Sequence, residues 1–315
     1  MSQESSDEVR PPSAGSVRVI LNPAAGRGQA ARRLRAWLPW LEYHCGTPHI
    51  VETARRGEAV DLARQAAAEG ASVVAAAGGD GTLHEVVNGL VREGRAAPAA
   101  VVPLPVGTGC DFARNVGMSR AAPRGGAGLR EMNVDVGEVT CEGAEGAVTL
   151  CFMNAVNAGA TTASALRVNR SAALRALGSA AYVVAGVPEL IARPTRRYRL
   201  RWQGGTDEGE YLAVSVCNGA RFGGGLALVP GARFDDGQLH LGTVAPTGVL
   251  GLLRLLAIGY QPDATPRPGV SARAVVEVSI EGAGPVEVDG ELPGNLPAGI
   301  RCLPGVLRLL LPASD

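Results

Sequence analysis

Short β-branched runs alternate with longer amphipathic segments from residue 17 onward, and this alternation predicts the first half of the fold. The predicted strands are Val17–Leu21, His49–Glu52, Ser72–Ala77 and 99–103. The predicted helices are 29–38, Glu58–Ala68 and Leu83–Leu90, the last preceded by a loop at 78–82. Because strands that alternate with helices are joined by crossovers, we expect a doubly wound α/β domain with a parallel sheet over residues 17–134.

After residue 134 the pattern changes to apolar runs bounded by glycines. These runs are 147–154, 196–202, 210–217, 238–244, 274–280 and 285–288. Runs of this kind are typical of antiparallel strands, so a β-rich, sandwich-like domain is predicted over residues 135–312. A segment with helical spacing at 171–192 interrupts them, and it is either a helix packed on this domain or a mobile cover over an apolar pocket.

The pattern favours neither a signal peptide nor a membrane span. Residues 1–16 are polar and rich in Ser and Pro, which predicts a disordered tail. The most apolar stretches, 180–192 and 248–260, are interrupted by proline or charged residues and fall short of the roughly 18 to 20 residues of a transmembrane helix.

Composition excludes several classes of function. The 30 basic residues balance the 30 acidic ones, and every basic residue is an arginine. The zero net charge argues against nucleic acid as a partner. The absence of lysine excludes the P-loop nucleotide site, the protein-kinase strand lysine and Schiff-base enzymes. Six cysteines without a CxxC pair are typical of buried free thiols in a reducing compartment.

Two glycine motifs compete as nucleotide sites. The first, Gly26, Gly28 and Ala31, spells GxGxxA after a strand, with Glu52 placed as a ribose-binding acid would be. Four residues separate the strand from Gly26, whereas the dinucleotide turn needs its first glycine tight against the strand end. An oxidoreductase is therefore the weakest of the alternatives.

The second motif is GGDGT, Gly78–Thr82, between an apolar strand and a helix. Its glycines let the backbone bend sharply, and the start of the helix presents unpaired N–H groups that suit phosphate. Asp80 would repel phosphate unless a divalent cation lay between them, so it points to Mg²⁺. The helix that follows opens with the spacing of a capping box, Thr82 to Glu85. The alternative to a phosphate site is a helix-capping turn in which Asp80 faces solvent.

A third loop, PVGTGCDFAR at Pro105–Arg114, follows the next strand and precedes a short helix. The carboxyl ends of parallel strands face one crevice in a doubly wound sheet, so this loop, GGDGT and the segment after Asn22 are expected to converge there. Arg27 and Arg114 are candidates to neutralise phosphate charge, or else they are solvated surface arginines.

Taken in order, NPxxG (Asn22–Gly26), GGDGT and PxGTGxDFAR resemble the diacylglycerol kinase catalytic-domain family, which includes sphingosine kinases and soluble bacterial lipid kinases. FMN at 152–154, the segment 217–239 and VDGE at 288–291 resemble that family as well. GGDGT alone also resembles NAD kinases and phosphofructokinases. The family resemblance implies an α/β nucleotide domain followed by a β-rich domain, with the active site in the cleft between them.

The resemblance further implies the cofactors ATP and Mg²⁺ and a set of site residues. The nucleotide-binding residues carried over are Asn22, Gly26, Arg27, Gly78, Gly79, Gly81, Thr82, Gly107, Thr108 and Asp111. The metal-binding residues are Asp80, Asp111, Asp135 and, at a second, structural Mg²⁺, Asp236. Asp289 is expected to be the general base with Glu291 in support, and Asp80 is the rival base. Asp289-Gly290 is equally typical of a two-residue hairpin turn.

The implied activity is phosphorylation of a hydroxyl on a membrane-derived lipid, with diacylglycerol as the leading substrate. The alternatives are another lipid (a sphingoid base, ceramide or phosphatidylglycerol), NAD as the acceptor, or an inactive regulator that binds nucleotide or lipid. The resemblance implies a cytoplasmic enzyme, peripheral at the inner membrane face, and a homodimer is compatible with the sequence.

One position departs from the family pattern. Cys110 stands where the family usually has the asparagine of GTGND, so a weakly hydrogen-bonding thiol replaces an amide. We expect this change to alter how the nucleotide is placed. A cysteine near a helix start is alternatively a low-pKa, oxidisable thiol.

Overall fold

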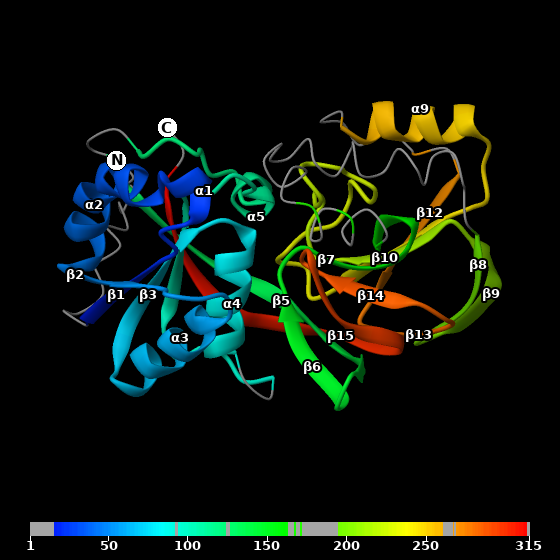
Figure 1. Ribbon diagram of the computed structural model, residues 1–315, viewed down its shortest axis with the longest axis horizontal. Coiled ribbons are helices and arrows are strands. Elements are labelled where there is room, and N and C mark those ends of the chain that lie inside the picture. The colour runs from blue at the N-terminus through cyan, green and yellow to red at the C-terminus, as the bar shows by residue number, and fades with distance from the viewer. Residues whose placement is uncertain are drawn as a thin grey trace, which may run out of the picture.

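The computed structural model shows two halves side by side, an α/β half and a β-rich half (Figure 1). It describes residues 16–91, 94–123, 127–162, 167, 171, 195–260, 267 and 269–313. The predicted helix at 171–192 lies outside the described residues except for residue 171. Within these ranges, no helix is long and apolar enough to cross a membrane.

The first half is a parallel sheet covered by helices, as the sequence predicts. Its strands are β1 (Ser16–Leu21), β2 (Pro48–Glu52), β3 (Ala71–Gly78) and β4 (Ala100–Pro105). They lie in the order β4-β3-β1-β2, and their pairings are parallel. The helices are α1 (Ala25–Gly28), α2 (Ala30–Cys45), α3 (Glu58–Ala68), α4 (Asp80–Leu90) and α5 (Asp111–Asn115). β3 is buried along nearly its whole length, as a strand with helices on both faces must be.

The second half is built from antiparallel strands, which confirms the predicted β-rich domain. In chain order they are β5 (Leu129–Gly143), β6 (Gly146–Phe152), β7 (Ala155–Gly159), β8 (Arg196–Trp202), β9 (Gly205–Tyr211), β10 (Ala213–Cys217), β11 (Leu239–Val244), β12 (Val270–Val275), β13 (Glu277–Glu281), β14 (Pro285–Val288) and β15 (Glu291–Pro312). Helix α9 (Val249–Gly259) lies along the edge of this half (Figure 1).

The last strand joins the two halves. β15 is 22 residues long and pairs antiparallel with β5, β13 and β14. Its far end runs parallel to β4, where Leu309 is in register with Val101. Leu307, Leu309 and Leu311 are buried in the core of the first half. One continuous sheet therefore crosses both halves, which fixes the loops of one relative to the strands of the other.

Candidate functional site

The loop after β3 turns directly into α4. Asp80 is the first residue of this helix, so Thr82 lies inside its first turn. The predicted capping box is therefore wrong, because the helix begins three residues earlier than that pairing requires. The Glu85 carboxylate instead accepts hydrogen bonds from the N–H groups of Gly57 and Ala59, at 3.0 and 3.2 Å, and holds the start of α3.

The second glycine loop packs against the first, backbone to backbone. The Gly107 N–H donates to the carbonyl oxygen of Gly78 at 2.8 Å. A Cβ atom at Gly107 would lie 2.5 Å from both the N and the Cα atoms of Gly79, so only glycine fits. At Gly81, by contrast, a Cβ atom would meet nothing within 4 Å. The two loops close on each other at Gly107 and leave open space beside Gly81.

The first strand brings a third segment to this place. Asn22 follows β1, and its Nδ2 donates to Oγ1 of Thr82 at 3.3 Å. Gly26 and Arg27 both have positive φ angles, 60° and 61°, which makes a tight left-handed turn. A Cβ atom at Gly26 would lie 2.5 Å from the carbonyl oxygen of Val106, so this turn packs on the second glycine loop. The three loops expected to converge do so.

Two arginines that sequence reasoning did not single out hold the second loop. Arg33 in α2 donates from Nη1 to the carbonyl oxygens of Val106 and Gly107, at 3.1 and 3.2 Å. Arg120 also donates to the Gly107 carbonyl oxygen. These guanidinium groups bring positive charge to a lysine-free site. No sequence motif marks them, because the contacts depend on how α2 and the segment after α5 pack against the loop.

Asp80 ties two loops together. Its Oδ2 accepts the N–H of Asp111 at 2.9 Å, and its Oδ1 accepts the N–H of Phe112 at 3.0 Å. It thereby caps the start of α5, where Cys110 provides no side-chain cap. Because backbone amides hold both oxygens, the alternative in which Asp80 faces solvent is wrong. Burial, followed by the neighbouring charge of Asp111, raises the pKa of Asp80 to about 6.

Asp111 links the α/β half to the β-rich half. Its Oδ1 pairs with Nη1 of Arg114 at 2.5 Å, and its Oδ2 accepts the N–H of Gly224 at 2.7 Å. Arg114 is 44% exposed and is held by this pair one turn along α5. The carboxylates of Asp80 and Asp111 thus lie next to each other where the two halves meet.

Asp289 lies in the predicted hairpin turn between β14 and β15, but its side chain is only 1% exposed. Its φ angle is 48°, a left-handed conformation that Asp tolerates better than most residues. Its Oδ1 accepts the N–H groups of Asn154 and Ala155 at 2.9 and 3.1 Å, and its Oδ2 accepts that of Met153 at 2.7 Å. The turn and the inward-facing carboxylate occur together, and the carboxylate organises the segment between β6 and β7.

The fourth contact of Asp289 comes from the other half of the molecule. Nδ1 of His84, in α4, lies 3.3 Å from Oδ2 of Asp289. Burial lowers the pKa of His84, but the hydrogen bond and charge of Asp289 outweigh that effect and raise it. Sequence reasoning missed His84, although its position four residues after Asp80 places both on one helix face.

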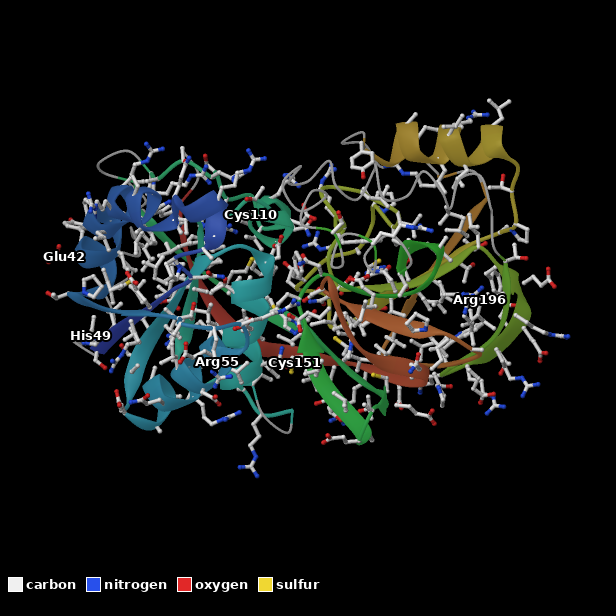
Figure 2. The ribbon with its side chains drawn as sticks, viewed as in Figure 1. Glu42, His49, Arg55, Cys110, Cys151 and Arg196 are labelled. Carbon is white, nitrogen blue, oxygen red and sulfur yellow. The ribbon has the colours of Figure 1, made fainter. Side chains whose placement is uncertain are left out.

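Asn88, one turn further along α4, fixes the helix against β6. Its Nδ2 donates to the carbonyl oxygens of His84 and Cys151 at 2.8 and 3.0 Å, and its Oδ1 accepts the N–H of Cys151 at 2.8 Å. Figure 2 labels Cys151 at this junction. His84 is therefore placed opposite Asp289 by a bidentate amide contact.

A buried polar network supports the Asp289 turn from below. Glu287 accepts from Nδ2 of Asn157 at 2.5 Å and from the N–H of Gly290. Asn157 in turn accepts from Oγ of Ser215 at 2.6 Å. Burial raises the pKa of Glu287 to about 7, so this carboxyl holds a proton over much of the acidic range.

Replacing Glu287 with Gln should flatten the pH dependence of stability. Burial raises the pKa of Glu287 from 4.5 to about 7, so the folded chain binds one more proton than the unfolded chain between those values. The free energy of unfolding then falls as pH rises through this window, by about 3 kcal/mol in all. In urea unfolding between these pH values, we expect the free energy of unfolding to fall more in the wild type than in Glu287→Gln, by this amount. Parallel profiles for the two proteins would contradict it.

The other two predicted metal ligands bind backbone amides or a histidine in the structure. Asp135, in β5, accepts the N–H groups of Gly237 and Gly305 at 2.7 and 2.8 Å. Oδ2 of Asp236 faces Nε2 of His240 at 3.2 Å. Over the described ranges, no three His, Cys, Asp or Glu side chains are grouped as a metal site. Their metal-binding roles stay predictions.

The Cys110 side chain is buried in the structure. Cys110 is 4% exposed, and burial, followed by the charge of Asp80, raises the pKa of its thiol to about 12. The low-pKa thiol alternative is therefore wrong, and Figure 2 shows Cys110 close to α5.

Glu291 forms an ion pair with Arg56. Its carboxylate lies 2.9 Å from Nη2 of Arg56, and the side chains of Glu291 and Arg56 are 31% and 70% exposed, respectively.

The cavities show which side of the glycine loops is open. Between the two loops, beside Gly79 and Cys110, the gap holds only about 10 Å³. Among the described residues, the space beside Gly81 is the open side of these loops. A larger groove of about 670 Å³ lies elsewhere, beside Asn88 and Arg301, and none of the predicted site residues lines it.

Comparison with known proteins agrees with this geometry. Residues 16–139 match the diacylglycerol kinase catalytic domain, and residues 154–311 match the YegS C-terminal NAD kinase beta sandwich-like domain. A Pseudomonas fluorescens protein named "probable lipid kinase YegS-like" is 34% identical over 82% of this chain and 84% of its own length. A Pseudomonas aeruginosa protein of the same name is 33% identical over 96% of this chain and 92% of its own.

Solved structures show the same fold. A diacylglycerol kinase from Bacillus anthracis superposes with a TM-score of 0.70 at 22% identity, over 94% of this chain and 97% of its own. Yeast NADH kinase superposes with a TM-score of 0.50 at 10% identity, over 96% of this chain and 85% of its own.

Proposed function

This chain belongs to the diacylglycerol kinase catalytic-domain family, and we propose that it transfers the γ-phosphate of ATP to a hydroxyl of a membrane-derived lipid, with diacylglycerol as the leading substrate. The proposal rests on one observation. Three loops suited to binding phosphate converge in the α/β half, and helix α4, which follows one of them, contacts the buried Asp289 carboxylate of the β-rich half through His84. Phosphoryl transfer needs this combination of phosphate positioning and a carboxylate near the attacking hydroxyl.

The glycine loops fit a nucleotide. The space beside Gly81 is open, and the start of α4 presents N–H groups toward it. Arg33 and Arg120 add positive charge behind Gly107, which offsets the missing lysine. We assign the ATP phosphates to this open side, with Thr82 and Asn22 at its edge.

The paired carboxylates of Asp80 and Asp111 fit a divalent cation. They lie next to each other, and the charge of Asp111 adds to the effect of burial in raising the pKa of Asp80. A bound Mg²⁺ would relieve this repulsion and neutralise charge on the transferred phosphate. Asp80 also holds the second glycine loop through α5, so its carboxylate positions the loop whether or not it binds the cation.

Asp289 suits the role of general base better than Asp80. The hydrogen bonds of Asp80 both go to backbone amides that begin α5, and releasing them would undo the cap. Three of the contacts of Asp289 are also to backbone amides, but the fourth, to His84 at 3.3 Å, is the longest and is made by a side chain. A substrate hydroxyl that approached Oδ2 beside His84, on the side of this long contact, would meet a carboxylate already held in place.

Replacing His84 with Phe is expected to lower kcat roughly 10- to 100-fold, the loss of one charge-assisted hydrogen bond. The KM for ATP should stay unchanged, because the His84 ring faces Asp289 rather than the glycine loops. His84→Gln should restore part of the rate. The matched control is His44→Phe, a half-buried histidine of α2 that contacts the Ala127 carbonyl oxygen away from the site. A raised KM for ATP with unchanged kcat would contradict the placement of His84.

Acceptor choice separates this proposal from the NAD kinase alternative. The purified protein is offered labelled ATP with diacylglycerol, a sphingoid base, ceramide, phosphatidylglycerol or NAD, with each lipid in mixed micelles. We expect label in a lipid and none in NAD. Label in NAD alone would favour a soluble-substrate kinase, and ATP binding without transfer to any acceptor would favour a regulator.

A further inference from the structure

Helix α9 turns an apolar face away from the protein. Its 11 residues include one charged side chain, Arg254. Leu250 is 82% exposed and Leu253 is 49% exposed, whereas Leu252 and Leu255 on the opposite side are buried in the β-rich half. A surface helix ordinarily presents polar residues outward, so the exposed leucines are at odds with contact to water alone.

The C-terminal end of α9 is fixed to the loop that reaches the site. The Ala227 N–H donates to the carbonyl oxygen of Gly259 at 2.7 Å. The same loop donates the Gly224 N–H to Asp111 at 2.7 Å. Tyr260, the next residue after α9, is 38% exposed and lies within electrostatic range of Asp111. In Figure 1, α9 and α5 lie toward the same side of the molecule. Helix α9 is therefore connected to the proposed active site through its C-terminal end and this loop.

Size and charge favour a lipid surface over a protein partner. A helix of this length spans about 16 Å, and its outer face is well short of the roughly 800 Å² that each partner contributes to a stable interface. Two copies meeting through α9 would also bring their Arg254 side chains together. Residues 249–260 contain no acidic side chain, so the face complements anionic headgroups.

We propose that α9 is a docking helix that lies in the interface of a bilayer containing anionic phospholipid. Leu250 and Leu253 enter the acyl boundary, Arg254 pairs with headgroup phosphate, and Tyr260 lies at the level of the headgroups. Docking in this way brings the proposed active site toward the lipid, so that a hydroxyl at the bilayer surface can reach Asp289. The inference rests on the proposed lipid kinase function for its purpose, but it is tested without catalysis.

The test is flotation with vesicles of phosphatidylcholine and phosphatidylglycerol in equal amounts, without ATP. The variant Leu250→Ser/Leu253→Ser should lose vesicle binding by on the order of 10- to 100-fold. Arg254→Gln should weaken binding less and reduce its sensitivity to salt. The matched control is Tyr43→Ser, which removes another exposed hydrophobic side chain, 83% exposed on α2, and should bind as the wild type does.

Two further results distinguish membrane docking from loss of the kinase and from dimerisation through α9. Activity on a water-dispersed short-chain diacylglycerol should be unchanged in the double variant, so loss of docking is distinguished from loss of the kinase. Equal vesicle binding by the wild type and the double variant would overturn the proposal. A wild-type dimer that the double variant dissociates would also overturn it and assign the face to a second copy.

Discussion

Replacing Asp289 with Asn is expected to abolish phosphate transfer while leaving the chain folded and able to bind ATP. Asn has nearly the same shape and tolerates the left-handed φ of 48°, but it cannot take a proton from a hydroxyl. The loss should be at least ~10²- to 10⁴-fold in kcat. Stability should fall by about 1 to 3 kcal/mol, because one amide N–H now faces a donor where the carboxylate accepted its hydrogen bond.

Two control variants test whether Asp289, and not another carboxylate of the site, is the base. The structure pairs Glu291 with Arg56, so, against the supporting role expected from the resemblance, Glu291→Gln should cost less than about 1 kcal/mol and leave most of the activity. Asp80→Asn removes one of the two side-chain hydrogen bonds that cap α5, so it should weaken ATP binding more than it slows phosphate transfer. Near-normal kcat in Asp289→Asn, together with complete loss in Asp80→Asn at saturating ATP, would make Asp80 the base instead.

Replacing Gly107 with Ala is expected to separate the two glycine loops and destroy nucleotide binding. The added Cβ would lie 2.5 Å from the backbone of Gly79, where no side chain can move to make room. We expect a loss of about 2 to 4 kcal/mol in the free energy of unfolding. Titration calorimetry should show ATP affinity reduced beyond measurement in the folded fraction.

Gly81→Ala is the matched change in the same motif. Its Cβ meets no protein atom within 4 Å, so stability should stay the same or rise by a few tenths of a kcal/mol. If the phosphates approach this side, as proposed, ATP affinity should still fall, because the methyl group occupies their space. Unchanged ATP affinity in Gly81→Ala would place the phosphates elsewhere. An unchanged melting temperature in Gly107→Ala would contradict the contact between the loops.

The first half of the fold is readable from sequence because its central strands, β3 and β4, are apolar runs and amphipathic helices alternate with the strands. β3 is an example, since burial on both faces leaves a continuous signal. β9 was missed for the opposite reason: Gly205–Tyr211 consists of polar residues, two glycines and one tyrosine, so it has no apolar run. The return of β15 to β4 was also missed, because pairing between strands so distant in sequence leaves no local pattern.

The candidate site divides in the same way. Loops that follow strands carry their own glycine signals, so the convergence of Asn22, GGDGT and Gly107 could be predicted. His84 and Glu287 could not, because each acts through a partner on a distant strand or turn. The solvent-facing alternative for Asp80 failed because α5, which begins beside it in space, takes both of its oxygens.

The most direct test of the central claim is the transfer of label from γ-labelled ATP to diacylglycerol in mixed micelles, by the wild type and by Asp289→Asn, with Mg²⁺ and after its chelation. We expect the wild type to form labelled phosphatidic acid only when Mg²⁺ is present, and Asp289→Asn to form none although it still binds ATP. Equal label from the two proteins, or ATP binding by the wild type without label in any lipid, would contradict it.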